Sequence, residues 1–155
     1  MGSKLAKSLL GAFVGIAALA PSVGASPFMD NAIDNYVGAG VRSGLNDSTA
    51  LVLDSKFEVI QFEQNSLSVR PAVLIGDQFE GRFPVSFDLP FDEQFLVFGG
   101  GGFAYNFDES DLDPMITAGL DMSLTERLVL NVEGNLILKS DDTDAEIAGS
   151  INWQF

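Results

Sequence analysis

Hydrophobic and polar residues alternate along most of the chain with a period of two. In the last stretch, Ile151 and Trp153 fall on one face, and Asn152 and Gln154 fall on the other. Runs of about ten alternating residues, separated by turn residues, predict antiparallel strands. Eight runs follow this pattern, at 35–43, 50–60, 66–76, 79–89, 95–107, 114–124, 127–139 and 144–155.

The two faces of these runs differ in charge. The apolar face carries no charged residue, whereas the basic residues beyond position 25 lie on the opposite face or at strand ends: Arg42, Lys56, Arg70, Arg82, Arg127 and Lys139. Aromatic residues gather toward run ends, among them Phe95, Phe103, Tyr105, Phe107, Trp153 and Phe155. Runs of this length match tilted transmembrane strands, which cross a bilayer only as a closed barrel because every backbone group must be paired. A charge on the lipid side would cost about 2–4 kcal/mol at the midplane.

The sequence therefore predicts an all-β fold: a closed eight-stranded antiparallel up-and-down transmembrane barrel with apolar side chains outward. Alternation alone also fits a soluble lipocalin-like binding barrel, in which the apolar side chains would point inward. The two architectures differ only in which face is enclosed.

The first 25 residues have the three parts of a secretory signal peptide. Lys4 and Lys7 supply positive charge, an apolar run follows at 9–20, and small residues precede a cleavage site after Ala25. The apolar run is shorter than the roughly 20 residues of a spanning helix. We expect a cleaved signal peptide (1–25), a short N-terminal lead (26–34) and the barrel (35–155).

Composition removes several classes of function. The chain has 22 acidic and 8 basic residues, a net charge of −14, which excludes electrostatic binding to nucleic acid. It has no Cys and no His, which excludes disulfides, thiolate nucleophiles, the usual zinc sites and His-based acid–base catalysis. We therefore expect no enzymatic activity and no cofactor. The hydrophobic fraction of 46% is high for so acidic a chain and requires an apolar environment.

Several segments resemble the OmpA/OmpX-like family of small eight-stranded outer-membrane barrels found in diderm bacteria. Residues 115–134 resemble the family's sixth strand, tight turn and seventh strand, while 35–41 resemble its first strand and 98–105 its fifth. The resemblance implies an outer-membrane location and both termini in the periplasm. It also implies outer-membrane lipid as the surroundings, a monomer, and folding by the barrel assembly machinery. The C-terminal assembly signal would be Ile151, Trp153 and Phe155.

The polar face supplies a candidate charge network for the lumen. Its members are Arg42, Lys56, Glu58, Arg70, Glu80, Arg82, Asp121 and Glu133. An eight-stranded barrel is only wide enough for its interior side chains to fill it. We therefore expect a salt-bridged plug in a protein with a structural or surface role. A narrow, porin-like passive channel for small solutes or ions is the alternative.

Two acidic clusters, at 108–113 and 141–144, are expected in links at the extracellular end. Hard cations prefer carboxylate oxygens, so one hypothesis is weak binding of divalent cations, or of lipopolysaccharide phosphates through them. The candidate ligands are Asp108, Asp111, Asp113, Asp141, Asp142 and Asp144. Neither cluster has the Gly and spaced Glu of a calcium loop, which favours a solvated acidic rim with no metal. The glycine run 99–102 lacks the Lys and helix of a phosphate loop and indicates a strand bend.

Overall fold

The computed structural model describes residues 33–44 and 48–155, so the expected signal peptide and most of the lead lie outside the described residues. The strands are β1 (Tyr36–Gly44), β2 (Ala50–Gln61), β3 (Ser66–Val69), β4 (Ala72–Ile75), β5 (Phe79–Pro90), β6 (Phe95–Asn106), β7 (Asp111–Ser123), β8 (Leu128–Leu138) and β9 (Thr143–Gln154). Within these ranges there is no helix long and apolar enough to span a bilayer.

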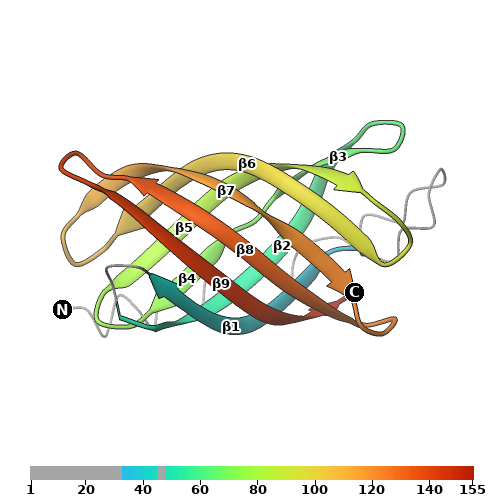
Figure 1. Ribbon diagram of the computed structural model, residues 1–155, viewed down its shortest axis with the longest axis horizontal. Helices are drawn as coiled ribbons and strands as arrows, with labels where there is room; N and C mark the ends of the chain where they lie inside the picture. The colour runs from blue at the N-terminus through green and yellow to red at the C-terminus, as the bar shows by residue number, and fades with distance from the viewer. Residues whose placement is uncertain (1–32, 45–47) are drawn as a thin grey trace.

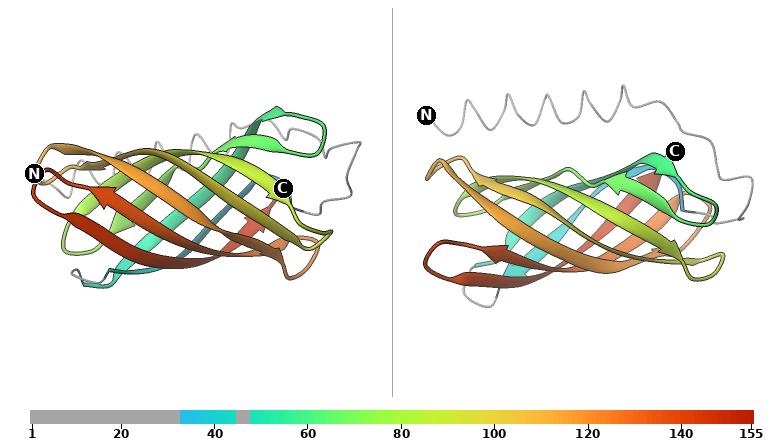
Figure 2. Two further views of the ribbon diagram at one scale, coloured as in Figure 1. Left: turned by 45° about the horizontal axis from the view of Figure 1, so that its top comes forward. Right: turned by 90° about the horizontal axis from the view of Figure 1, so that it is seen from above.

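The strands close into a ring. Neighbouring strands pair antiparallel, and β1 pairs with β2 on one side and with β9 on the other. The segments β3 and β4 both lie between β2 and β5, so they share one place and the ring has eight places. The strands wind obliquely around the long axis, as the views in Figure 1 and Figure 2 show. The predicted closed antiparallel barrel is confirmed.

The third predicted strand, 66–76, is divided in the structure. β3 ends at Val69 and β4 begins at Ala72, with Arg70 and Pro71 between them. The Arg70 N–H still donates to the Pro84 carbonyl at 3.0 Å, but Pro71 has no N–H to continue the ladder. Proline chemistry therefore breaks a strand that alternation alone predicts as continuous.

The acidic segment 108–113 is only partly a link, which corrects the sequence interpretation. β7 begins at Asp111, which pairs with Asn106 of β6. The turn itself is 107–110 and contains Ser110 at a φ of 57°. Three of the residues expected in a loop thus belong to a strand, because cross-strand pairing extends beyond the alternating run.

The outside of the barrel is apolar and the inside is polar. Outward side chains include Ile147, Phe83 and Trp153, which are 66%, 58% and 50% exposed. Inward side chains include Lys56 and Asp121, both of which are fully buried. A soluble lipocalin-like barrel needs the opposite arrangement, so the structure contradicts that alternative.

Glycine in β6 allows the β5 backbone to approach closely on the inward face. A Cβ on inward-facing Gly100 would collide with the β5 backbone at Val85 and Ser86, whereas one on outward-facing Gly99 would meet its nearest neighbour at 3.9 Å. Glycine on the concave side of a curved strand is a means by which small barrels close. The run 99–102 lies within the continuous strand β6.

The two ends of the barrel are built differently. One end, called here the terminal end, holds the turns 62–65, 91–94 and 124–127 together with the start of β1 and the end of β9. There Phe155 N donates to Asn35 O at 3.0 Å. The distal end holds the turns 76–78, 107–110 and 139–142 and the adjoining ends of β1 and β2. Aromatic rings pair at both ends, with centroid distances of 6.4 Å for Phe57 and Phe155 and 5.2 Å for Phe79 and Phe107.

Candidate functional site: the lumen and its distal mouth

Arg70 is the centre of a buried network in the half of the lumen nearer the terminal end. Its Nη2 lies 2.9 Å from Asp121 Oδ2 and 3.1 Å from Asp88 Oδ1. Its Nη1 donates to the Tyr36 hydroxyl at 2.8 Å, and its guanidinium lies 3.5 Å from the Phe98 ring centroid. Hydrogen bonds and ring stacking thus compensate the loss of hydration of this cation.

Asp121 is held by two further donors. The Tyr36 hydroxyl donates to Asp121 Oδ1 at 2.9 Å, and Asn131 Nδ2 donates to the same oxygen at 2.8 Å. Tyr36 therefore accepts from Arg70 and donates to Asp121, which links the three groups in a cycle. Such closed networks fix each side chain in one rotamer.

Asp88 collects the remaining donors of this region. Ser86 Oγ donates to Asp88 Oδ1 at 2.7 Å, and Ser68 Oγ donates to Oδ2. The Lys56 ammonium lies 3.9 Å from Asp88 Oδ2 and donates to the Ile33 carbonyl at 3.3 Å. Both charged groups are fully buried, so Asp88 compensates the Lys56 ammonium, and Lys56 together with Arg70 compensates Asp88.

A second network lies toward the distal end. The Arg82 guanidinium makes a two-pronged contact with the Glu146 carboxylate, and its Nε donates to Glu80 Oε1 at 2.6 Å. Arg42 Nε lies 3.4 Å from Glu146 Oε2, and Asn135 Nδ2 donates to Glu146 Oε1 at 3.3 Å. Charged side chains from several walls of the barrel thus meet across the lumen.

The terminal end of the lumen is closed by packed side chains. An apolar cluster lies there, formed by Ile33, Tyr36, Leu96, Phe98 and Val129. Next to it, Asp34 N donates to Gln154 Oε1 at 3.1 Å, and Gln154 Nε2 donates to the Glu126 carbonyl at 2.5 Å. Burial raises the pKa of the Asp34 carboxyl, and the nearby Lys56 ammonium opposes that rise. The residues that lead into β1 therefore cover this opening.

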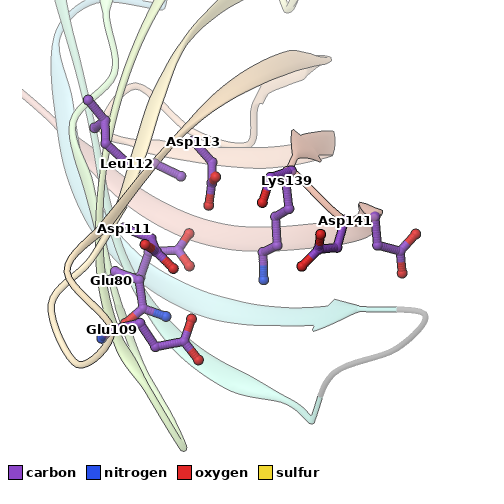
Figure 3. A pocket seen from close by; sticks show the side chains of 11 residues that line it. Glu80, Glu109, Asp111, Leu112, Asp113, Lys139 and Asp141 are labelled. Atoms are coloured by element: carbon purple, nitrogen blue, oxygen red, sulfur yellow. The ribbon is translucent and has the colours of Figure 1, made fainter.

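The distal end opens into an acidic vestibule. A cavity of about 380 Å³ lies there, lined by Glu80, Glu109, Asp111, Asp113, Asp141, Asp142 and other residues. Lys139 projects among these carboxylates in Figure 3. An adjoining cavity of about 400 Å³ shares Glu80, Glu109 and Lys139 and also contacts Arg42. The two cavities show that the lumen is open at its distal mouth.

The acidic residues considered for divalent cations have different roles. Four of them line the vestibule: Asp111, Asp113, Asp141 and Asp142. Asp108 accepts from the Phe79 N–H at 2.7 Å, and Asp144 pairs with Lys139 at 2.7 Å. Among residues 33–44 and 48–155, no group of three or more acidic side chains is arranged to hold a metal ion.

The residues considered for the lumen network also separate into groups. Arg42, Lys56, Arg70, Arg82 and Asp121 are buried, and Glu58, Glu80 and Glu133 are partly buried. Neither Glu58 nor Glu133 forms an ion pair with any described residue.

Important members of the networks are absent from the sequence-based set: Tyr36, Asp54, Asp88 and Glu146. The sequence did contain a signal for them, because each lies on the polar, inward-facing side of its strand. Asp88, for example, lies on the same face of β5 as Ser86. Which inward residues meet across the lumen depends on the stagger of the closed sheet, and alternation does not reveal that stagger.

The fold and its sidedness define a class: the small antiparallel β-barrel of transmembrane type, apolar outside and hydrogen-bonded within. No protein-family profile matches the chain, and no curated protein sequence is significantly similar to it.

Solved structures share this fold. A de novo designed transmembrane β-barrel matches with a TM-score of 0.63 and 16% identity, over 78% of this chain and 94% of the designed one. The Yersinia pestis outer membrane protein Ail, in a phospholipid bilayer nanodisc, matches with a TM-score of 0.56 and 10% identity. The match covers 78% of this chain and 98% of the Ail chain. The N-terminal β-barrel domain of Pseudomonas aeruginosa OprF matches with a TM-score of 0.54 and 10% identity. The match covers 78% of this chain and 96% of the OprF domain. Identities this low establish a common fold and nothing finer.

Proposed function

We propose that the chain is an exported outer-membrane barrel with a structural or surface role and no catalytic activity. The observation that carries this proposal is the apolar belt around the outside, where side chains such as Val132, Ile147 and Ile151 are 44%, 66% and 48% exposed. A soluble monomer rarely exposes so continuous an apolar surface. Acyl chains would cover it, and the closed ladder would leave no backbone group unpaired in the hydrocarbon.

The buried networks support a filled lumen rather than a pore. Arg70 lies over the ring of Phe98, a member of the apolar cluster that closes the terminal end. A solute that enters the vestibule would have to displace side chains held by several hydrogen bonds each. The vestibule is the one observation in favour of a narrow passive channel, which remains the second candidate.

The C-terminal strand supports recognition by the barrel assembly machinery. Ile151, Trp153 and Phe155 lie on the outward face of β9 and beyond it, and they are 48%, 50% and 41% exposed. An assembly factor could read these side chains before acyl chains cover them. The acidic vestibule would then face the cell exterior, in a monomer, and present negative charge to the medium.

Cell fractionation combined with heat-modifiable gel mobility tests the proposal. We expect the protein in the outer-membrane fraction, with a folded band that shifts only after boiling. Recovery in the aqueous fraction without detergent would contradict it. Planar-bilayer recordings of the purified protein separate the two candidates, since the filled lumen predicts no reproducible conductance steps and the channel predicts them.

A further inference from the structure

Three buried side-chain oxygens in the described part of the chain have no hydrogen-bond partner: Thr117 Oγ1, Asn135 Oδ1 and Asn152 Oδ1. Asn152 Oδ1 lies by itself beside Gly38 of β1. Thr117 of β7 and Asn135 of β8 are each 2% exposed, and they lie directly opposite each other in the β7–β8 ladder. An unpaired polar atom is costly where water is scarce, so two of them in adjacent positions require an explanation.

The amide nitrogen of Asn135 fixes the direction of its oxygen. Nδ2 donates to Glu146 Oε1 of β9 at 3.3 Å and to Glu133 Oε1 at 3.1 Å. The reverse orientation would place the amide oxygen against two carboxylates, which accept hydrogen bonds when they are ionised. Asn135 pairs with Glu146 on one side of its strand and with Thr117 on the other. Because Nδ2 faces Glu146, Oδ1 faces the side of Thr117.

An apolar layer separates Thr117 from the solvent of the vestibule. Met115 and Ile137 pair across the same ladder on the distal side of Thr117, and they are 3% and 2% exposed. Together with Ala104, which also lines the vestibule, they form an apolar cluster. The other sheet neighbour of Thr117 is Gly100 of β6, which has no side chain to offer as a partner. This position therefore suits one isolated polar molecule and not a column of bulk water.

The separation of the two side chains suits a single bridging molecule. Directly opposed residues of an antiparallel pair have Cβ atoms about 4.5–5.5 Å apart, which one water can span because it accepts one hydrogen bond and donates others. We propose that the lumen binds one ordered water molecule, which accepts from the Thr117 hydroxyl and donates to Asn135 Oδ1. Buried waters commonly satisfy polar groups that lack a protein partner. This water connects β7 to the distal network, because Asn135 is bonded to Glu146 and Glu146 to Arg82.

Nuclear magnetic resonance of the purified chain, refolded in deuterated detergent micelles, tests the site. We expect nuclear Overhauser cross-peaks from water to the Thr117 methyl group and to the Asn135 Hβ protons, with the sign of a long-lived bound water. Thr117→Val has nearly the same shape and should abolish the cross-peaks at Asn135. Asn135→Leu should abolish those at Thr117. Thr117→Ser keeps the hydroxyl, so it is the matched control and should retain the cross-peaks at Asn135.

The melting temperature in the same micelles gives an independent readout. Replacement of a hydroxyl that has no partner by a methyl group should raise the melting temperature, because it removes an unsatisfied polar group. Replacement of a hydroxyl that holds a bridging water should lower it, because Asn135 Oδ1 then loses its donor. We therefore expect Thr117→Val to melt a few degrees below wild type.

Three results overturn the proposal. The first is a wild-type spectrum without the cross-peaks. The second is a cross-peak at the Thr117 methyl group that persists in Asn135→Leu, because it then arises from exchange of the hydroxyl proton with solvent. The third is a Thr117→Val variant that melts above wild type.

Heat-modifiable gel mobility shows whether each variant is folded. If Asn135→Leu does not fold, the direction of the melting shift in Thr117→Val decides the question. Because the site lies within the lumen and the measurements use micelles, they are independent of the cellular location and role proposed above.

Discussion

Arg70 Nη2 and Asp121 Oδ2 lie 2.9 Å apart, although the two residues are 51 positions apart in the sequence. Arg70 lies at the junction of β3 and β4, and Asp121 lies on β7, so the contact connects walls of the barrel that are not neighbours in the ring. Both side chains are almost completely buried. Such a buried pair matters for stability because removal of one partner leaves the other charge uncompensated in an interior with little water.

Replacement of the central cation should therefore weaken the fold strongly. Arg70→Met removes the ion-pair partner of Asp121 and the nearer of the two partners of Asp88, while it keeps an unbranched, flexible side chain. We expect a loss of about 3–5 kcal/mol in the free energy of unfolding, as for other broken buried pairs. Urea unfolding in detergent, followed by Trp153 fluorescence, measures it.

Lys139→Met is the matched control for this prediction. Its ion pair with Asp144 is at the distal rim, with the Lys139 side chain 36% exposed. Such a pair contributes no more than about 1 kcal/mol. Equal losses in the two variants would show that the Arg70 network does not hold the barrel together.

The apolar belt predicts a depth-dependent cost for charge. Val132 is outward at the middle of β8, whereas Leu124 is outward in the turn between β7 and β8. In lipid bilayers, Val132→Arg should cost about 2–4 kcal/mol and Leu124→Arg about 0–1 kcal/mol. Reversible unfolding from liposomes measures both, and equal costs would mean that no acyl chains surround Val132.

The close approach of the β5 backbone to Gly100 predicts that neighbouring glycines of β6 tolerate substitution differently. Gly100→Ala places a methyl group against the backbone at Val85 and should cost about 1–3 kcal/mol or prevent closure. Gly99→Ala places its methyl group at ordinary van der Waals distance, 3.9 Å from Thr117 O, and should be neutral or stabilise by up to about 1 kcal/mol. The folded fraction after refolding, read from heat-modifiable bands, compares the two. Similar yields would argue against a steric requirement for glycine at position 100.

Alternation of side chains predicted the barrel well because one physical constraint dominates it. Each strand must turn one face to an apolar environment, so parity alone assigns Ile151 outward and Asn152 inward. The alternation of side chains does not reveal where the backbone ladder is interrupted or extended. The interruption of the third strand follows from the missing N–H of Pro71, and the early start of β7 follows from pairing of Asp111 with Asn106.

The sequence does not reveal which inward side chains pair with one another inside the lumen. Asp88 has the parity of an inward residue, but its contacts with Lys56 and Arg70 come from different strands. Closure of the ring sets these contacts through the stagger between strands, and one sequence does not specify that stagger. The missed partners of the network have this origin.

The C-terminal side chain should act on assembly more than on stability. Phe155 is 41% exposed, its ring is 6.4 Å from that of Phe57, and it lies just beyond β9 at the terminal end of the barrel. We expect Phe155→Ala to lower the amount of folded barrel in cells while it refolds normally in detergent. Phe91→Ala, at an aromatic that is 79% exposed at the same end, is the control and should leave the cellular amount unchanged. Equal effects of both variants in cells would remove any special role for the C-terminus.

The sidedness of the wall is the central claim, and site-directed spin labelling along β8 in bilayers tests it most directly. Nitroxides at consecutive positions 129–137 report contact with lipid through collisions with oxygen, and contact with water through collisions with a polar nickel complex. Contact with oxygen should alternate with a period of two and be highest at Leu130, Val132 and Leu136, whose side chains face outward. Maxima at Val129, Asn131 and Asn135 instead, or no alternation at all, would contradict it.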